Sequence, residues 1–413
     1  MNMKAIKYLG MLLAMLALSV SFVSCSSDDD DEDGGISANP EEEMVGAFEK
    51  NGVLQVNVRL AGSVESMIGH TRKYQTEKMK IKGPLNGDDI RCIRDMMISS
   101  RGGRLEYLDM SDVNIVAGGG WYYGNANDWA EGESIYVTKP DILGECMFDS
   151  CDVIEELILP NSVVRVDHHL FGYSENRSIR SITIGKYTIG QIWHEEENRL
   201  PLSALTLGSL EEINVHPDNT KYSSEKGIMY DKSKTFLYTV PCKYRGTLSL
   251  PTTLKTIGDN AFWGVAASSI ELPNSVKRLE SSAFSYSEIR KINTGSVSEM
   301  GDYVFSSCSA EDIILSESLT CIPQYAFFDC NSLSSITIPS SVKIIEYGAF
   351  DSENLKTINI KNSNPPSFAS DINHYYNVFY GANQITIVVP KGSKSRYQSA
   401  FIWSECDIIE NAN

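Results

Sequence analysis

The sequence repeats itself about every 22 residues, and this periodicity restricts the possible folds more than any other feature. Five phenylalanines follow one another at spacings of 22, 21, 22 and 23 residues, and two earlier copies lie 23 residues apart. A repeat of this length cannot bury its own apolar face, so neighbouring copies have to stack. The phenylalanines are Phe148 and Phe171 in the early copies, then Phe262, Phe284, Phe305, Phe327 and Phe350.

The fullest copy, residues 326–345, predicts the path of the chain within one repeat. Leu333, Ile336 and Ile338 are spaced for a bend followed by a short strand. Pro339 ends that strand because proline cannot donate to a ladder of hydrogen bonds. The pattern therefore predicts a mostly β repeat solenoid, with turns of about 22 residues that stack at about 4.8 Å and with caps over both open ends.

The unit A-F-x-x-C-x-x-L-x-x-I-x-I-P-x-S-V resembles the BspA-like (treponemal-type) leucine-rich repeat family of bacterial surface proteins. The resemblance implies a right-handed leucine-rich-repeat coil over residues 142–363. It also implies an amino-terminal cap and first strand over 41–115 and a carboxy-terminal capping segment over 364–413. Some members of the family bind host matrix proteins, so the resemblance implies binding and no catalysis.

The period is interrupted between Phe171 and Phe262, which are 91 residues apart. Alternating apolar residues inside this gap predict a hairpin insertion near 216–246. Similar hairpins recur in the family that the repeat resembles. Whether the hairpin serves binding or only spaces the repeats stays open.

The first 24 residues have the layout of a secretory signal peptide, with Lys4 and Lys7 ahead of an apolar stretch at 9–23. The segment ends Phe-Val-Ser-Cys, which resembles a bacterial lipobox and predicts lipid attachment to Cys25, although Phe22 replaces the usual leucine. The alternative is an ordinary signal peptide with a chance cysteine. Six acidic residues at 28–33 predict a solvated tether over 25–40, and with the lipobox they indicate an outer-membrane lipoprotein exposed at the cell surface.

The charge of the chain excludes a nucleic-acid partner. The formal net charge is −18, and removal of Lys4 and Lys7 with the signal segment brings the mature chain to −18 − 2 = −20. The lipid anchor is then the only expected contact with a membrane. The familiar hydrolase, metalloprotease and nucleotide-binding motifs are absent from the sequence, so we expect no enzymatic activity and no cofactor.

Histidines and cysteines give no clear metal site. His168 and His169 could supply metal ligands together with His194 if loops on neighbouring turns converged, but paired loop histidines beside a solvated acidic patch explain them better. Three cysteines, Cys151, Cys308 and Cys330, each follow a repeat phenylalanine by three residues and are expected to be small buried side chains. Because Cys308 and Cys330 lie on adjacent repeats, a bridge between them stays open.

A glycine-rich aromatic insertion at 116–141 supplies the candidate ligand contacts. Aromatic rings on flexible backbone give contact area at low entropic cost, as in recognition loops. The alternative is a loop that folds its rings back over the cap. The candidate residues are Trp121, Tyr122, Tyr123 and Trp129.

Three functions remain possible on these grounds. The first is a non-enzymatic adhesin or protein-interaction scaffold that binds a surface protein of a host or neighbouring cell through the extended repeat face. The second is a glycan-binding accessory lipoprotein that uses the aromatic loop. A structural or enzymatic role would need a pocketed set of acids or bases that the sequence does not offer. We expect a monomer, while the identity of the ligand cannot be derived from the sequence.

Overall fold

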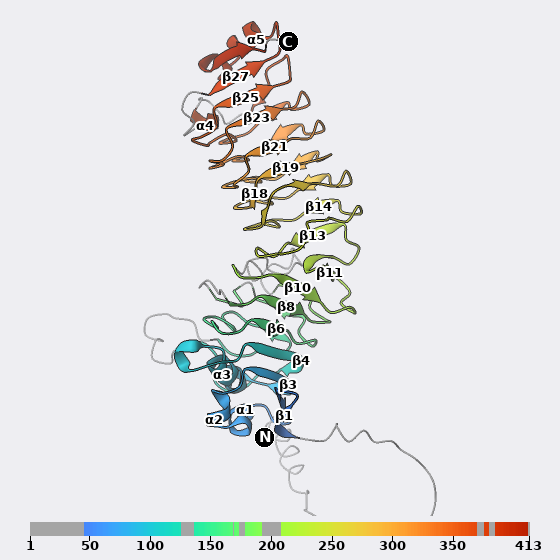
Figure 1. Ribbon diagram of the computed structural model, residues 1–413, viewed down its shortest axis with the longest axis vertical. Helices are drawn as coiled ribbons and strands as arrows, with labels where there is room; N and C mark the ends of the chain where they lie inside the picture. The colour runs from blue at the N-terminus through green and yellow to red at the C-terminus, as the bar shows by residue number, and fades with distance from the viewer. Residues whose placement is uncertain are drawn as a thin grey trace, which may run out of the picture. The chain divides into compact units, whose positions relative to one another are not determined.

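A computed structural model describes residues 45–124, 136–167, 169–172, 178–191, 208–369, 376–379 and 385–411. The predicted signal peptide, the tether and Cys25 lie outside these residues. Contacts separate Met1–Met44 from Val45–Asn413, and only the second unit is described below (Figure 1). Within the described residues, no helix combines the length and the apolar character needed to cross a membrane.

The unit begins with a seven-stranded sheet of order β1-β2-β3-β4-β6-β8-β10. Only the first pair is antiparallel, and every later pair is parallel. Parallel pairing requires a crossover after each strand, as expected of stacked repeats. The strands are β1 (Gly46–Lys50), β2 (Val53–Asn57), β3 (Lys78–Leu85), β4 (Tyr107–Ile115), β6 (Glu156–Ile158), β8 (Ser181–Ile184) and β10 (Glu212–Val215).

Short helices accompany the first strands, as Figure 1 shows for α3 beside β3 and β4. The longest begins at a capping box, in which the Asn86 side chain accepts from the Asp89 amide and the Asp89 carboxylate accepts from the Asn86 amide. The Asp89 carboxylate also accepts from the Val64 amide at 3.0 Å, so one buried acid joins two helix starts. The helices are α1 (Val64–Ile68), α2 (His70–Lys73), α3 (Gly87–Met96) and η1 (Ser99–Arg101).

The repeats after residue 255 pair in parallel with partners one repeat further along the chain. Ile270 pairs with Ile292, and Ile336 pairs with Ile358, each a step of 22 residues. In Figure 1, β19, β21, β23, β25 and β27 follow one another in chain order. These strands are β14 (Thr256–Ile257), β15 (Ala266–Ala267), β16 (Ile270–Glu271), β17 (Arg278–Leu279), β18 (Glu288–Ile289), β19 (Lys291–Asn293), β20 (Glu299–Met300), β21 (Asp312–Ile314), β22 (Cys321–Ile322), β23 (Ser335–Ile338), β24 (Ile344–Ile345), β25 (Thr357–Ile360), β26 (Ser367–Phe368) and β27 (Thr386–Val389).

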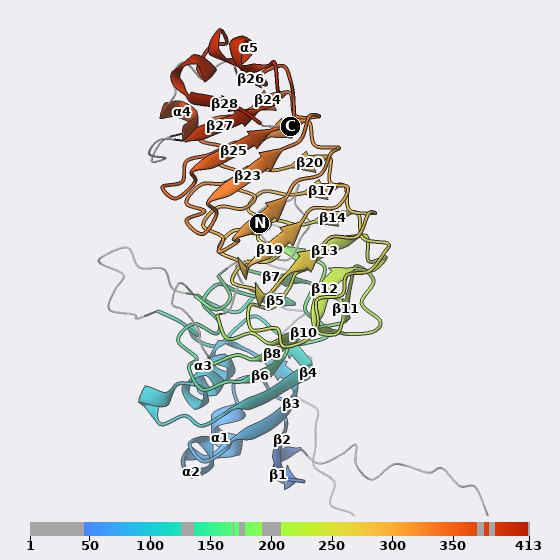
Figure 2. The same ribbon diagram turned by 45° about the horizontal axis from the view of Figure 1, so that its top comes forward.

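The described carboxy-terminal residues add two short helices, a 3-10 turn and a last strand. Figure 2 shows the last strand, β28 (Asp407–Glu410), beside β27. The last strand pairs in parallel with β27. Tyr397 and Trp403 of these elements are buried in the same apolar core as the repeats. The elements are α4 (Tyr376–Phe379), α5 (Lys394–Gln398), η4 (Trp403–Glu405) and β28 (Asp407–Glu410).

The phenylalanines selected by the period form a buried column. Neighbouring rings lie 4.6 to 5.9 Å apart between centroids, and the angles between their planes range from 4° to 26°. None of these side chains is more than 1% exposed, so each copy contributes one ring to a continuous stack. The column consists of Phe262, Phe284, Phe305, Phe327, Phe350 and Phe379.

A hairpin interrupts the repeats within the segment where the sequence predicts an insertion. Strands β11 (Tyr222–Glu225) and β12 (Ile228–Asp231) are antiparallel, and β12 is antiparallel to β13 (Phe236–Thr239). From β13 onward the same sheet continues in parallel through β14, β17 and β20. The hairpin therefore connects to the later repeats through ordinary ladder pairing. A separate small sheet in the amino-terminal repeats joins β5 (Ile142–Leu143), β7 (Arg165–Val166) and β9 (Gly190–Gln191).

Candidate functional site

A pocket of about 550 Å³ lies where α3 and η1 meet the start of the glycine-rich aromatic insertion. A volume of this size is within the range of small-ligand sites. Three arginines and three aromatic rings line it, with one buried carboxylate. The lining residues are Arg91, Arg94, Ile98, Ser100, Arg101, Trp121, Tyr122, Tyr123, Gly124, Asp149 and Ser150.

Glycines at 118–120 place the aromatic residues beside α3. The Gly87 amide donates to the Gly118 carbonyl at 3.1 Å, and the Gly120 amide donates to Asp88 Oδ1 at 3.2 Å. A Cβ on Gly119 would lie 2.7 Å from Asn86 Oδ1, and a Cβ on Gly87 would lie 1.9 Å from the Gly120 carbonyl oxygen. Side chains at these positions would therefore separate the loop from the helix.

Two arginines of the pocket, Arg94 and Arg91, donate to backbone carbonyl groups. Arg94 is 5% exposed, and its guanidinium donates to the carbonyl oxygens of Cys146, Met147 and Asp149 at 2.5, 2.9 and 3.0 Å. The same guanidinium lies 4.9 Å from the centre of the Tyr123 ring, a cation–π distance. Arg94 is therefore a fixed part of the pocket wall.

Arg91 holds the aromatic segment in the same way, because its Nη1 donates to the Trp121 carbonyl oxygen at 2.7 Å. Its Nη2 pairs with Asp88 at 2.6 Å. The guanidinium carbon lies 5.3 Å from the centre of the Trp121 ring. Since Arg91 pairs with Asp88 and Arg101 pairs with Asp95, the guanidinium charges here are largely compensated.

Of the predicted ligand contacts, Tyr122 is buried, and Trp121 and Tyr123 lie half-buried in the pocket wall. Tyr122 is 2% exposed and donates to the Glu145 carbonyl oxygen at 2.8 Å, and burial raises the pKa of its hydroxyl. Burial, and then a hydrogen bond with Asp149, raise the pKa of Tyr123 to about 12, so both tyrosines are neutral at physiological pH. Trp129 lies outside the described residues.

A second candidate surface is formed by four aromatic side chains of consecutive repeats, here called the aromatic row: Tyr303, Tyr325, Phe328 and Tyr347. The Tyr303 and Tyr325 rings stack at 4.8 Å with planes 13° apart. The Tyr325 ring also meets Phe328 and Tyr347 edge-on, at 5.7 and 5.4 Å. Tyr303 is 41% exposed and Phe328 is 36% exposed, so large apolar rings reach solvent together.

The backbone of the aromatic row is in an unfavourable conformation. Tyr303 and Tyr325 have φ of 57° and 52°, a left-handed region that L-residues with bulky side chains rarely adopt. The same place in other repeats, two residues before the buried phenylalanine, holds Asn260, Ser282 and Gly348, which tolerate this conformation better. Sequence reasoning missed the row, although comparison of this one position across the repeats would have found two tyrosines where small or polar residues are expected.

The glycine of the next repeat makes room for the row. A Cβ on Gly348 would lie 2.4 Å from Tyr325 Cε1, and Gly348 itself has φ of 63°. The left-handed turn itself recurs in the other repeats, so what distinguishes this place is the two bulky side chains in that turn, with space left open for one ring. Backbone strain of this kind is commonly found at functional sites.

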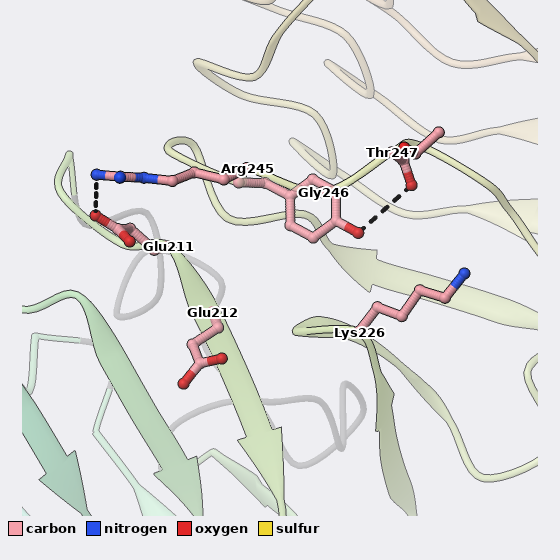
Figure 3. A pocket seen from close by; sticks show the side chains of 7 residues that line it. Glu211, Glu212, Lys226, Arg245, Gly246 and Thr247 are labelled. Atoms are coloured by element: carbon pink, nitrogen blue, oxygen red, sulfur yellow. Dashed lines mark hydrogen bonds and ion pairs between the residues drawn. The ribbon is translucent and has the colours of Figure 1, made fainter.

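A third hollow, of about 500 Å³, lies beside the hairpin and is drawn in Figure 3. Figure 3 shows Arg245 extended toward Glu211, and their ion pair measures 2.7 Å. Glu211 also pairs with Arg180 at 2.9 Å. Glu211 is thus engaged by two arginines, an arrangement that suits a structural ion pair better than a proton-transfer site.

The part of the chain that the structure describes contains no group of three or more histidine, cysteine or acidic side chains arranged to hold a metal ion. His168 and His194 lie outside that part. The repeat cysteines Cys151, Cys308 and Cys330 are all buried, as the sequence predicts.

The BspA type leucine rich repeat region matches this chain in six copies, over residues 133–216 and 255–372. The chain therefore belongs to the BspA-type leucine-rich repeat family. The unmatched stretch between the two regions contains β11, β12 and β13. A search of curated proteins finds no match.

Among solved structures, a leucine-rich repeat protein from Bacteroides ovatus is similar at 16% identity and a TM-score of 0.40, over 90% of this chain and 99% of that one. One from Eubacterium ventriosum is similar at 17% identity and 0.38, over 73% and 91%. The pneumococcal vaccine antigen PcpA is similar at 15% identity and 0.39, over 82% and 69%. Because these scores are low, the family assignment depends on the six repeat copies.

Proposed function

We propose that the chain is a cell-surface lipoprotein that acts as a non-enzymatic adhesin or protein-interaction scaffold, with the aromatic row as its contact surface. The observation that carries the proposal is the left-handed backbone at Tyr303 and Tyr325 together with the exposed rings of Tyr303 and Phe328. Tyrosine is enriched among the residues that dominate protein–protein binding energy. A core does not need these rings, because the buried phenylalanine column already fills it.

A protein partner suits the row better than a sugar. Sugars bind aromatic side chains through the open face of a ring. Tyr303 and Tyr325 stack at 4.8 Å, so one face of each ring is covered by the other and is not open to a sugar, while their edges and hydroxyl groups remain for a partner. Edges and hydroxyl groups pack and hydrogen-bond well against another protein surface.

The repeats would extend this surface as a right-handed coil of about 22 residues per turn. The supporting observation is the parallel register, in which Ile257 pairs with Leu279 and Ile322 pairs with Ile345, steps of 22 and 23 residues. The lipid would be attached at Cys25, and the acidic segment after it would separate the repeats from the outer membrane. Metabolic labelling with a fatty-acid analogue tests this anchor: the wild type takes up label and Cys25→Ser does not, whereas label in the variant refutes it.

Binding is tested with residues 36–413, produced without lipid, against panels of host matrix proteins and of polysaccharides. We expect binding to a protein and its loss in the double variant Tyr303→Asn, Tyr325→Asn, since asparagine tolerates the left-handed backbone and removes the rings. Tyr187→Asn is the matched control, because Tyr187 is 55% exposed and lies outside the row. Protein binding that survives the double substitution would move the contact surface elsewhere.

The second candidate is glycan binding at the arginine and aromatic pocket. It is favoured by the volume of the pocket and by the half-buried rings of Trp121 and Tyr123 in its wall. Binding to the polysaccharide panel that is lost in Trp121→Ala and kept in the double tyrosine variant would select this function. If neither panel binds, both recognition functions lose their support.

A further inference from the structure

Two buried cysteines face each other across adjacent repeats. Cys308 and Cys330 are 2% and 0% exposed, and their sulfur atoms lie 3.7 Å apart. Each follows the buried phenylalanine of its repeat by three residues, so the two occupy the same place one repeat apart. The other described position of this kind with a cysteine is Cys151, and the repeat after it has Ser174 at the equivalent place of the sequence.

The backbone around the two cysteines is held at ladder spacing. The Phe305 amide donates to the Ala326 carbonyl at 3.0 Å, and the Ser307 amide donates to the Phe328 carbonyl at 2.8 Å. Chains joined by such bonds have Cα atoms about 5 Å apart, within the range that a disulfide spans. Closing a sulfur separation of 3.7 Å therefore needs side-chain rotation and little backbone movement.

We propose that Cys308 and Cys330 form a disulfide in the exported protein, and that this bond cross-links the two repeats that carry Tyr303, Tyr325 and Phe328. The inference goes beyond the proposed function, since it requires no ligand. It depends on an oxidising compartment, where disulfides form and persist. The bond would fix the separation of the repeats on which the Tyr303 and Tyr325 rings stack.

The chemistry is thiol–disulfide exchange with an oxidant that is itself a disulfide, either a small molecule or an oxidoreductase. The hydrogen bond with Cys330 lowers the pKa of Cys308, while burial raises the pKa of Cys330 well above its ordinary value. In the exchange, the Cys308 thiolate attacks the oxidant, which loses one thiolate and leaves a mixed disulfide on Cys308. Cys330 then gives up its proton to solvent and attacks Cys308, and the second oxidant sulfur leaves as a thiolate.

Two electrons pass in this sequence from the cysteine pair to the disulfide of the oxidant, which ends as two thiols. Since both sulfur atoms are buried in the folded chain, the oxidant reaches Cys308 while the repeats are closing or during local opening. The finished bond is then protected from reduction by the same burial.

The test uses the full chain, exported into an oxidising compartment and purified without reductant. The chain is unfolded in the presence of an alkylating reagent, digested and analysed by mass spectrometry. We expect a cross-linked peptide pair containing Cys308 and Cys330, with Cys151 alkylated as an internal control. Prior reduction should make all three alkylated, and Cys330→Ser should leave Cys308 alkylated. Alkylation of both Cys308 and Cys330 in the unreduced wild type would overturn the proposal.

A second experiment tests the disulfide without exporting the protein. The full chain is reduced, freed of reductant and incubated with oxidised glutathione, and its thermal midpoint is measured before and after. We expect the midpoint to rise by about 5 °C in the wild type, because the bond limits the unfolded chain. The variant Cys308→Val, Cys330→Ser should not shift, and it should fold because Val265 and Ser287 occupy the same place in earlier repeats. A wild-type midpoint that glutathione leaves unchanged would contradict the cross-link.

Discussion

The amino-terminal core, from Leu54 to Tyr238, and the carboxy-terminal core, from Ile228 to Ile408, are held together in different ways. In the amino-terminal core, buried polar groups join segments that are not repeated along the chain. Arg94 donates to three backbone carbonyl groups, and Asp89 accepts from amides at the starts of two helices. In the carboxy-terminal core, the same apolar position recurs in each repeat. Both cores are packed from buried apolar side chains; the first adds individual buried hydrogen bonds to this packing, and the second adds a stack of one repeated ring.

The hairpin of β11, β12 and β13 contributes side chains to both cores. Successive side chains of a strand point to opposite faces, so a strand between two cores can serve both. The hairpin strands do so, since neighbouring residues belong to different cores. This position suggests a structural role for the insertion, beyond the choice between binding and spacing that the sequence leaves open. Tyr222, Met229 and Tyr238 pack in the amino-terminal core, and Ile228, Tyr230 and Leu237 pack in the carboxy-terminal core.

The largest expected effect tests the stacking. Phe305→Ala should lower the free energy of unfolding by about 3–5 kcal/mol, because it leaves a cavity between Phe284 and Phe327, whose rings lie on either side. The measurement is chemical denaturation followed by circular dichroism. If Phe305→Ala costs no more than Phe328→Ala, on the exposed row, the column is not the main support of this core.

The second-largest expected effect tests the buried hydrogen bonds of the amino-terminal core. Arg94→Met keeps the volume of the side chain but leaves the Cys146, Met147 and Asp149 carbonyls without their donor, at a cost of about 3 kcal/mol. Arg101→Met is the control, since Arg101 is 55% exposed. Equal stabilities of the two variants would mean that the buried hydrogen bonds of Arg94 contribute little.

The same difference explains which features the sequence predicts. The repeats, the buried phenylalanines and the buried repeat cysteines follow from a period that one residue type marks again and again. The pocket could not be predicted in full, because Arg91 reaches Trp121, 30 positions away, and Arg94 reaches Cys146, 52 positions away, only after folding. The aromatic row was missed because tyrosine in left-handed backbone contradicts turn propensity.

Gly348→Ala examines how closely the row depends on its neighbouring repeat. The new Cβ would lie 2.4 Å from Tyr325 Cε1, and the backbone at φ of 63° disfavours alanine, so we expect a loss of about 1.5 kcal/mol. The ring of Tyr325 should also move, which near-ultraviolet circular dichroism would detect. Gly392→Ala is the control, because its φ is 77° but no atom lies within 4 Å of the added Cβ. Equal losses in the two variants would indicate backbone strain alone.

A pH series sharpens the account of the amino-terminal core. Burial opposes ionisation of Asp109, but hydrogen bonds from Ser111 and then Lys80 outweigh it and lower the pKa of this carboxyl. Because the pKa of Asp109 is lower in the folded chain than in the unfolded chain, ionised Asp109 stabilises the fold. This stabilisation is complete above the unfolded pKa of about 4 and is lost as the pH falls through the folded pKa. Asp109→Asn should remove about 1 kcal/mol at neutral pH and flatten this acid limb. Asp112→Asn, at a 55% exposed partner of Lys80, should leave the limb in place.

The smallest expected effect on stability is at Tyr303, where two contributions oppose each other. Tyr303→Asn removes the strain of a bulky side chain in left-handed backbone, at φ of 57°, which raises stability. It also removes a ring that stacks on Tyr325 at 4.8 Å, which lowers stability. Each contribution is about 1 kcal/mol, so the free energy of unfolding should change by less than about 0.5 kcal/mol. Tyr303→Phe keeps both contributions and removes only the hydroxyl group, which makes it the matched control.

Such a small change in the free energy of unfolding would show that the aromatic row and the buried phenylalanine column, two residues further along each repeat, have different roles. A ring that can be removed without loss of stability, from backbone that disfavours it, is retained for a reason other than folding. If Tyr303→Asn instead lowers stability by about 2 kcal/mol or more, the ring is a structural support like Phe305, and the aromatic row loses its claim as the contact surface. Denaturation of Tyr303→Asn and Tyr303→Phe beside the wild type distinguishes the two outcomes.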